Sequence, residues 1–150
     1  MKEKLLVSAC LLGENCKYNG GNNYTPAVEA LRERFEVIPV CPEQLGGLPT
    51  PRTPSERVGD KVLTRDGRDV TEAFRRGAAK TLAIAQAEGV TRAVFQVRSP
   101  SCGCGTIYDG TFSGKLVPGK GVTAQLLEQS GIEICDSTRI NELLDMEGAL

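Results

Sequence analysis

Residues 4–13 read KLLVSACLLG, and the apolar run 5–9 within them predicts a short buried strand. Three more apolar runs predict strands further along the chain, at 37–40, 93–97 and 132–134. Helical stretches separate these runs, and the longest of them extends over about 71–88. Strands that alternate with helices form βαβ units around a mainly parallel sheet. The sequence therefore predicts an α/β fold, a Rossmann-like open sheet flanked by helices.

Smaller elements complete this prediction. Further helices are expected over about 26–35, 122–129 and 139–144, and small β excursions at 57–63 and 106–117. The buried side of the long helix is expected to consist of small and aliphatic residues, namely Ala78, Ala79, Leu82, Ile84 and Ala85.

Composition narrows the possible functions. The 150 residues suit one domain spanning 1–150. Lys plus Arg total 18 and Asp plus Glu total 19, so the net charge of −1 lacks the footprint of a protein that binds long nucleic acid. The chain has no His, which excludes Ser-His-Asp triads, Cys-His dyads and His-ligated zinc. The apolar run before Cys10 is too short for a secretion signal, so we expect a cytoplasmic protein with no membrane partner.

Three of the six cysteines follow predicted strands. Cys10 comes after the first strand, Cys41 after the second, and Cys102 a few residues beyond the third. Because parallel strands end on one edge of a sheet, and open α/β sheets bind ligands there, these thiols are expected to converge. A single cysteine is more often a small buried hydrophobe, but three at successive strand exits favour a site.

The other three cysteines have different expected roles. Cys16 in the first loop could face the same pocket as a fourth thiol, Cys104 could be a ligand, and Cys135 is expected in the core. Thiolate-only ligation selects zinc, copper(I) or an iron–sulfur cluster. Structural zinc usually takes paired C-x₂₋₄-C ligands, and none occurs here. Three cysteines from separate loops, with one position open, instead suit a cubane cluster whose fourth iron lacks a protein ligand.

Groups near the thiols are candidates for catalysis and binding. Glu43, two residues after Cys41, could act as a general base or acid if burial raises its pKa, or could instead cap a helical turn. Ser99 and Ser101 precede Cys102, and Ser99 is a candidate substrate contact. Ser101 is a candidate catalytic residue whose hydroxyl could bond a cluster sulfide or the substrate, or could instead make a local turn bond.

Two further segments carry weaker signals. The loop around Gly119 and Gly121 opens a helix, so its backbone amides could bind an anionic part of a substrate, although an ordinary capped turn has the same pattern. The proline-rich stretch before Arg52 could direct that side chain inward or leave it in solvent.

Several segments together resemble a known family. They are VSACLLG at 7–13, CPE at 41–43, GGL at 46–48, PR at 51–52, SPSCG at 99–103, IYDG at 107–110 and GKGVTA at 119–124. In this order they resemble the short bacterial proteins of the domain-of-unknown-function 523 family, over nearly the whole chain. The resemblance implies a desulfidase that removes sulfur from thiouracil, and a longer relative with an extra domain acts on 4-thiouridine in transfer RNA.

The resemblance also implies site roles. It assigns a [4Fe–4S] cluster to Cys10, Cys41 and Cys102, and the catalytic carboxylate to Glu43. A second catalytic cysteine of the thiouracil enzymes falls within 46–47, where this chain has two glycines, so either another thiol, Cys16 or Cys104, replaces it or the substrate differs.

The predicted reaction is a non-redox, hydrolytic release of hydrosulfide from a small thiolated base or nucleoside; transfer RNA is possible but not favoured, given the charge. Two alternatives remain. The first is a cysteine-ligated metal or thiol-redox module without turnover, in which Cys102 and Cys104 form a reversible pair. The second is a sulfur carrier or thiolation enzyme, for which the sequence has no nucleotide phosphate loop.

Overall fold

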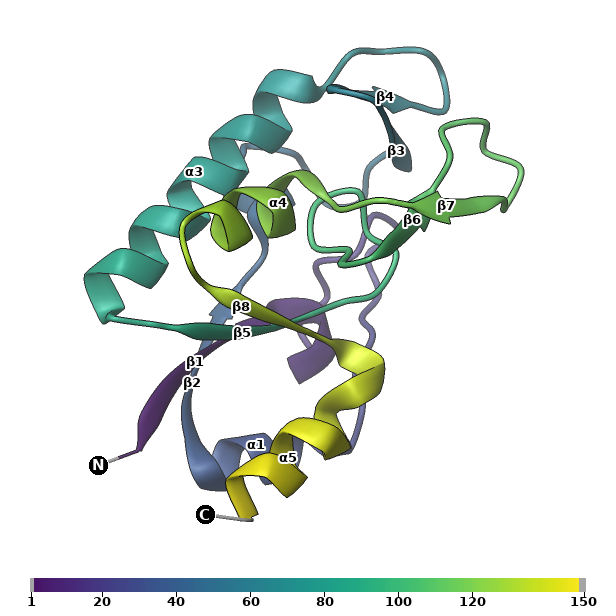
Figure 1. Ribbon diagram of the computed structural model, residues 1–150. Coiled ribbons are helices and arrows are strands. Elements are labelled where there is room, and N and C mark those ends of the chain that lie inside the picture. Colours follow the sequence, from purple (N-terminus) through teal and green to yellow (C-terminus); the bar gives the residue numbers. More distant parts are fainter. Residues whose placement is uncertain (1, 149–150) are drawn as a thin grey trace.

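A computed structural model describes residues 2–148, and its centre is a four-stranded sheet (Figure 1). The strands are β1 (Glu3–Ser8), β2 (Phe35–Val40), β5 (Arg92–Phe95) and β8 (Glu133–Asp136), in the order β2-β1-β5-β8. Each neighbouring pair is parallel. The predicted α/β class and parallel sheet are confirmed.

Helices cover both faces of this sheet (Figure 1). The helices α3 (Thr71–Glu88) and α4 (Val122–Gln129) pack on one face, and α1 (Ala27–Arg34) and α5 (Ile140–Gly148) on the other. Successive residues of a strand point to opposite faces, so Leu6 enters the α3–α4 core while its neighbours Leu5 and Val7 enter the α1–α5 core. Burial on both faces explains why β1 is a continuous apolar run.

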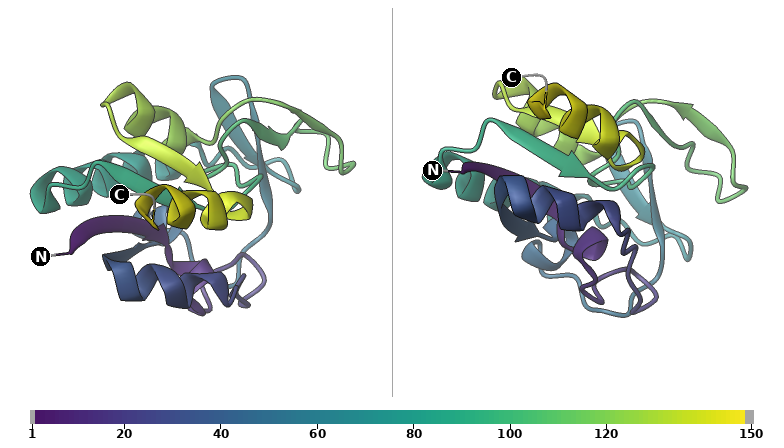
Figure 2. Two further views of the ribbon diagram at one scale, coloured as in Figure 1. Left: turned by 60° about the horizontal axis from the view of Figure 1, so that its bottom comes forward. Right: turned by 90° about the horizontal axis from the view of Figure 1, so that it is seen from below.

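Two hairpins extend from the end of the molecule away from the N-terminus (Figure 2). The first pairs β3 (Ser55–Val58) with β4 (Lys61–Thr64), and the second pairs β6 (Thr106–Tyr108) with β7 (Leu116–Pro118). Both were expected as small β excursions, and they lie beyond the carboxyl ends of the central strands.

The buried face of α3 differs from the expectation. Ala78 and Ala85 are buried as predicted, but Ala79 is exposed, and Phe74 and Thr81 are buried instead. The core stripe therefore follows positions 74, 78, 81 and 85, the three-to-four spacing of one helix face.

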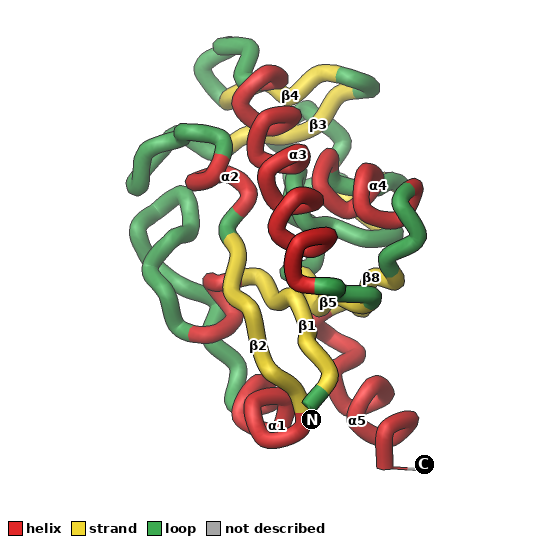
Figure 3. The backbone as a smooth tube through the Cα atoms, turned by 90° about the vertical axis from the view of Figure 1, so that its left-hand side faces the viewer, coloured by secondary structure: helices red, strands yellow, loops and turns green. Residues whose placement is uncertain are grey.

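A short helix after β2 was not predicted. This helix, α2 (Pro42–Leu45), continues from the end of β2 and lies beside α3 (Figure 3). The two backbones approach closely, because a Cβ at Gly46 would clash with the carbonyl oxygen of Ala73, and one at Gly77 with that of Pro42. Glycine at both positions therefore fixes where the CPE segment sits.

Short 3₁₀ turns complete the chain, η1 (Ala9–Leu12) after β1 and η2 (Ser137–Arg139) before α5. Among residues 2–148, no helix is long and apolar enough to cross a membrane.

Candidate functional site

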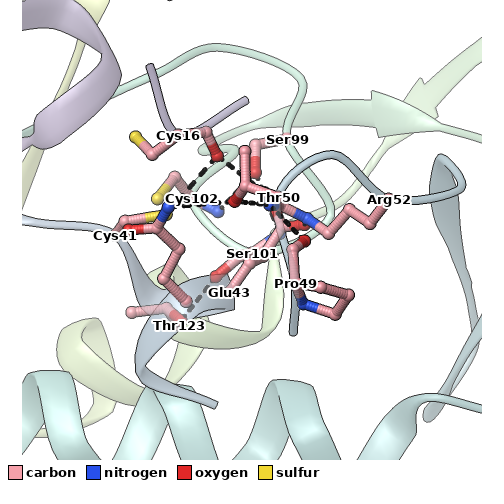
Figure 4. A network of polar contacts seen from close by, with 11 residues as sticks. Cys16, Cys41, Glu43, Pro49, Thr50, Arg52, Ser99, Ser101, Cys102 and Thr123 are labelled. Atoms are coloured by element: carbon pink, nitrogen blue, oxygen red, sulfur yellow. Dashed lines mark hydrogen bonds and ion pairs between the residues drawn. The ribbon is translucent and has the colours of Figure 1, made fainter. Parts of the chain in front are cut away.

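A cavity of about 520 Å³ opens at the carboxyl edge of the sheet. Four cysteines line it: Cys10, Cys16, Cys41 and Cys102. Figure 4 shows Cys16, Cys41 and Cys102 with their sulfur atoms gathered at one side of a polar network. The convergence expected from the strand exits is therefore present in the structure, and Cys16 faces the same pocket.

Local structure fixes each thiol. Cys10 lies in η1, directly after β1, and Cys41 is the residue that precedes α2. Cys102 lies in a turn beyond β5, where the Ser99 hydroxyl accepts hydrogen bonds from the amides of Ser101 (3.1 Å) and Cys102 (3.0 Å). Ser99 lines the cavity and also closes the turn that presents Cys102.

Hydrogen bonds with Cys16 make Cys10 and Cys41 good metal ligands. The Cys16 thiol hydrogen-bonds to Cys10 and Cys41, which lowers the pKa of Cys10 and lowers the pKa of Cys41 to about 7. The same bonds raise the pKa of Cys16, which therefore keeps its proton. The amide of Asn23 adds a second donor to the Cys10 sulfur, at 3.4 Å. Thiolates are the metal-binding form of cysteine.

Cys102 is buried, with 5% of its surface exposed. Burial raises the pKa of its thiol, while a hydrogen bond from Ser8 opposes that effect. A coordinated metal deprotonates such a thiol.

The arrangement of the thiols distinguishes between kinds of metal group. Within residues 2–148, no three His, Cys, Asp or Glu side chains converge closely enough for a single metal ion. In an iron–sulfur cubane each cysteine binds a different iron, so the thiolates stand further apart around a larger group. Cys10, Cys41 and Cys102 come from three separate segments of one cavity, and this arrangement fits an iron–sulfur cubane.

A buried carboxylate lies beside the thiols. The Glu43 side chain is 18% exposed, and its Oε1 accepts from Nε of Arg52 at 3.1 Å. Burial raises the pKa of Glu43, and Arg52 opposes that rise. Arg52 is itself only 7% exposed and also donates to the carbonyl oxygen of Cys16 at 2.9 Å. Of the two orientations open for Arg52, the structure has the inward one.

Ser101 lies near the pocket but does not line it. Its hydroxyl is buried and shares a hydrogen bond of 2.7 Å with the Thr123 hydroxyl at the start of α4 (Figure 4). This contact holds the Cys102 turn against α4. The Ser101 hydroxyl is therefore engaged in a structural contact between distant segments, and it makes neither the expected local turn bond nor a contact with the cavity.

The expectation that the 119–121 loop presents free amides to an anion is corrected. The amide of Gly121 donates to the carbonyl oxygen of Gly103 at 2.7 Å, and that of Thr123 to the Ser101 carbonyl oxygen at 2.9 Å. A Cβ at Gly121 would clash with the same Ser101 carbonyl. Gly119 lines a different hollow, so neither glycine lies on the cysteine cavity.

The remaining cysteines point elsewhere. Cys104 lies 3.3 Å from a carboxylate oxygen of Glu128, and burial together with that contact raises its pKa to about 11. Cys135 was expected in the core, and the structure has it only half-buried, packed against the α1–α5 core. No sequence pattern indicates Asn23, because its contact with Cys10 depends on how the first loop returns to the pocket.

Fold and site together define a class of protein: a parallel α/β domain with a thiol-lined cavity and a buried carboxylate at the carboxyl edge of its sheet. Residues 5–139 match the model of the 2-thiouracil desulfurase family, and the chain belongs to that family. An uncharacterized protein of Bacillus subtilis (strain 168), YbbK, is 42% identical, with 93% of this chain and 99% of the relative covered. A solved structure described as the [4Fe-4S]-dependent thiouracil desulfidase TudS is 41% identical, with a TM-score of 0.92 over 99% of this chain and 100% of that one.

Proposed function

We propose that this chain is an iron–sulfur-dependent desulfidase that removes sulfur from a thiolated pyrimidine of the thiouracil type without net redox change. The observation that carries the proposal is the joint placement of Cys10, Cys41, Cys102 and the buried Glu43 on one cavity. Membership of the 2-thiouracil desulfurase family and the likeness to TudS support the same activity.

Cys10, Cys41 and Cys102 are the residues that would hold a [4Fe–4S] cluster. When bound, the cluster supplies an open, sulfur-binding iron that draws electron density from the thiocarbonyl carbon of the substrate. Protein hydrogen-bond donors bind a soft sulfur far less well, so the cysteine set suits a sulfur substrate.

Glu43 is proposed to activate water. Its buried carboxylate takes a proton from a water molecule, whose oxygen then attacks the thiocarbonyl carbon. Arg52 fixes one carboxylate oxygen of Glu43 and leaves the other available for that water. The carbon–sulfur bond then breaks, so that one water is consumed and a carbonyl product and hydrosulfide are formed.

Cys16 is proposed as the proton donor to the departing sulfur. It lines the same cavity as the three cysteines that would hold the cluster. This assigns to Cys16 the work of the family cysteine that is absent at 46–47. Ser99 remains a proposed substrate contact, since it lines the cavity.

The substrate is proposed to be a free base or nucleoside, handled by a single cytoplasmic domain spanning residues 1–150. The cavity volume falls in the range typical of small-molecule sites, roughly 300–1,000 Å³.

The test is turnover of 4-thiouracil by protein purified without oxygen, followed as uracil and hydrosulfide formed. Glu43→Gln should lower kcat by about 100-fold or more while the iron content stays unchanged. Cys104→Ser, outside the cavity, is the matched control and should leave kcat unchanged. A wild-type protein that forms no uracil, or a Glu43→Gln variant with full turnover and intact iron, would contradict the proposal.

A further inference from the structure

The cysteine cavity is bordered by two residues with an unusual backbone. Among residues 2–148, the non-glycine residues with positive φ are Arg98 (63°) and Phe112 (56°), and both line this cavity. A bulky residue in that region costs conformational energy, and it persists where surrounding contacts determine it fully.

A buried carboxylate holds Phe112 in place. Glu56 on β3 is 9% exposed, and its Oε1 accepts from the amides of Gly110 (2.9 Å) and Phe112 (3.1 Å). Gly110 has φ 95° and packs so closely on Val58 that a Cβ would clash with it. The guanidinium of Arg65 lies over the Phe112 ring, 5.6 Å from its centroid. The β3–β4 hairpin thus fixes the turn between β6 and β7.

Phe112 stands apart from the other phenylalanines. Phe35, Phe74 and Phe95 are at most 2% exposed and belong to the interior, whereas Phe112 is half-buried on the cavity wall. The cavity therefore has a buried sulfur end, where Cys102 is 5% exposed, and a more open aromatic end formed by Phe112 with its neighbours.

We propose that Phe112 is a substrate-binding residue whose ring packs against the pyrimidine, and that Glu56 is the positioning residue that sets its place. The inference rests on the proposed function, because a thiolated pyrimidine is the ligand considered. A planar heterocycle gains affinity from an aromatic contact that is indifferent to its substituents. Such a contact serves binding, whereas Glu43 and the cysteines serve the reaction.

The first experiment separates binding from turnover in anaerobically purified protein. Phe112→Ala should raise KM for 4-thiouracil about tenfold, the effect of one base–aromatic contact, with kcat within about twofold of wild type. Phe112→Tyr keeps a ring and should keep KM. Tyr24→Ala, which removes an exposed aromatic ring outside the cavity, is the matched control and should change neither constant.

The second experiment tests the role of Glu56 by a double-mutant cycle. Glu56→Ala should raise KM by itself but add little in a Phe112→Ala background, because it acts through that ring. Circular dichroism at the assay temperature checks that each variant is folded. If Glu56→Ala unfolds the chain, Glu56→Met, which keeps the approximate size but has no oxygen to accept from the amides of Gly110 and Phe112, is used in the same cycle.

Direct binding distinguishes this inference from the proposed function. Equilibrium dialysis of 4-thiouracil against the Glu43→Gln protein should show a Kd about tenfold weaker when Phe112 is also alanine. A wild-type protein without turnover would contradict the proposed function, while a Kd that depends on Phe112 would still support the inference. Unchanged Kd and KM in Phe112→Ala would overturn the inference about Phe112. A fall in kcat with unchanged KM would also overturn it, because the ring would then protect the site from water without binding substrate.

Discussion

Replacement of Arg52 by Met tests the polar network behind the thiols. Arg52 is 7% exposed and donates to Glu43 at 3.1 Å, to the Cys16 carbonyl oxygen at 2.9 Å and to the Thr50 hydroxyl at 2.9 Å. Met has a similar length but no charge, so Arg52→Met leaves the Glu43 carboxylate buried without its cation.

The magnitude follows from that burial. Removing one partner of a buried ion pair costs about 3–5 kcal/mol, and the lower figure applies because 18% of Glu43 remains exposed. For a domain of this size, a loss of about 3 kcal/mol lowers Tm by about 6–12 °C.

The loss should depend on pH. Burial raises the pKa of Glu43 from its ordinary value of 4.5, and loss of Arg52 raises it further. When the pKa of a carboxyl is higher in the folded state than in the unfolded state, the unfolded chain releases the proton first as the pH rises. The carboxyl therefore costs no stability below the unfolded-state pKa, and the cost grows as the pH rises from that value to the folded-state pKa. The difference from wild type should therefore be small near pH 4.5 and grow as the pH rises toward 8.

Thermal unfolding followed by circular dichroism at pH 5 and pH 8 measures this difference. Arg32→Met, which removes an exposed ion pair with Glu29, is the control and should leave Tm nearly unchanged at either pH. Adding Glu43→Gln to Arg52→Met should restore part of the stability and remove the pH dependence. An equal loss at both pH values would refute the reasoning.

Three further changes have expected outcomes. Gly46→Ala forces α2 away from α3 and should destabilise the fold by about 3 kcal/mol in urea unfolding. Cys16→Ala removes the hydrogen bond that holds the pKa of Cys41 near 7, so alkylation of Cys41 in metal-free protein, followed by mass spectrometry, should require higher pH; Cys16→Ser should shift it less. Ser101→Ala leaves the Thr123 hydroxyl unpaired and should cost about 1–3 kcal/mol, which Ser101→Ala with Thr123→Val should partly recover.

The fold and the thiol convergence could be predicted because both follow from strand order. The apolar runs predict the parallel strands. Because parallel strands end at one edge of the sheet, they also predict that Cys10, Cys41 and Cys102 meet there. Cys104 lies outside the cavity although it follows Cys102 by two residues, because Cys102 sits in a turn and not in extended backbone, where side chains at i and i+2 share a face.

The loop contacts could not be predicted in the same way. Whether Arg52 faces inward depends on several partners from distant loops, including Glu43 and the Cys16 carbonyl oxygen. The amides near Gly121 were expected to be free, but the Cys102 turn supplies carbonyl oxygens that take them up. Such pairings are set by tertiary packing and leave no pattern in the local sequence.

The central claim is that Cys10, Cys41 and Cys102 hold an iron–sulfur cluster. Iron and acid-labile sulfide per chain, measured after anaerobic purification, test it most directly, with Cys104→Ala as the control outside the cavity. About four of each are expected in wild type and in the control, and neither in alanine variants of the three cysteines. About one zinc per chain in wild type, or full iron in any of the three variants, would contradict it.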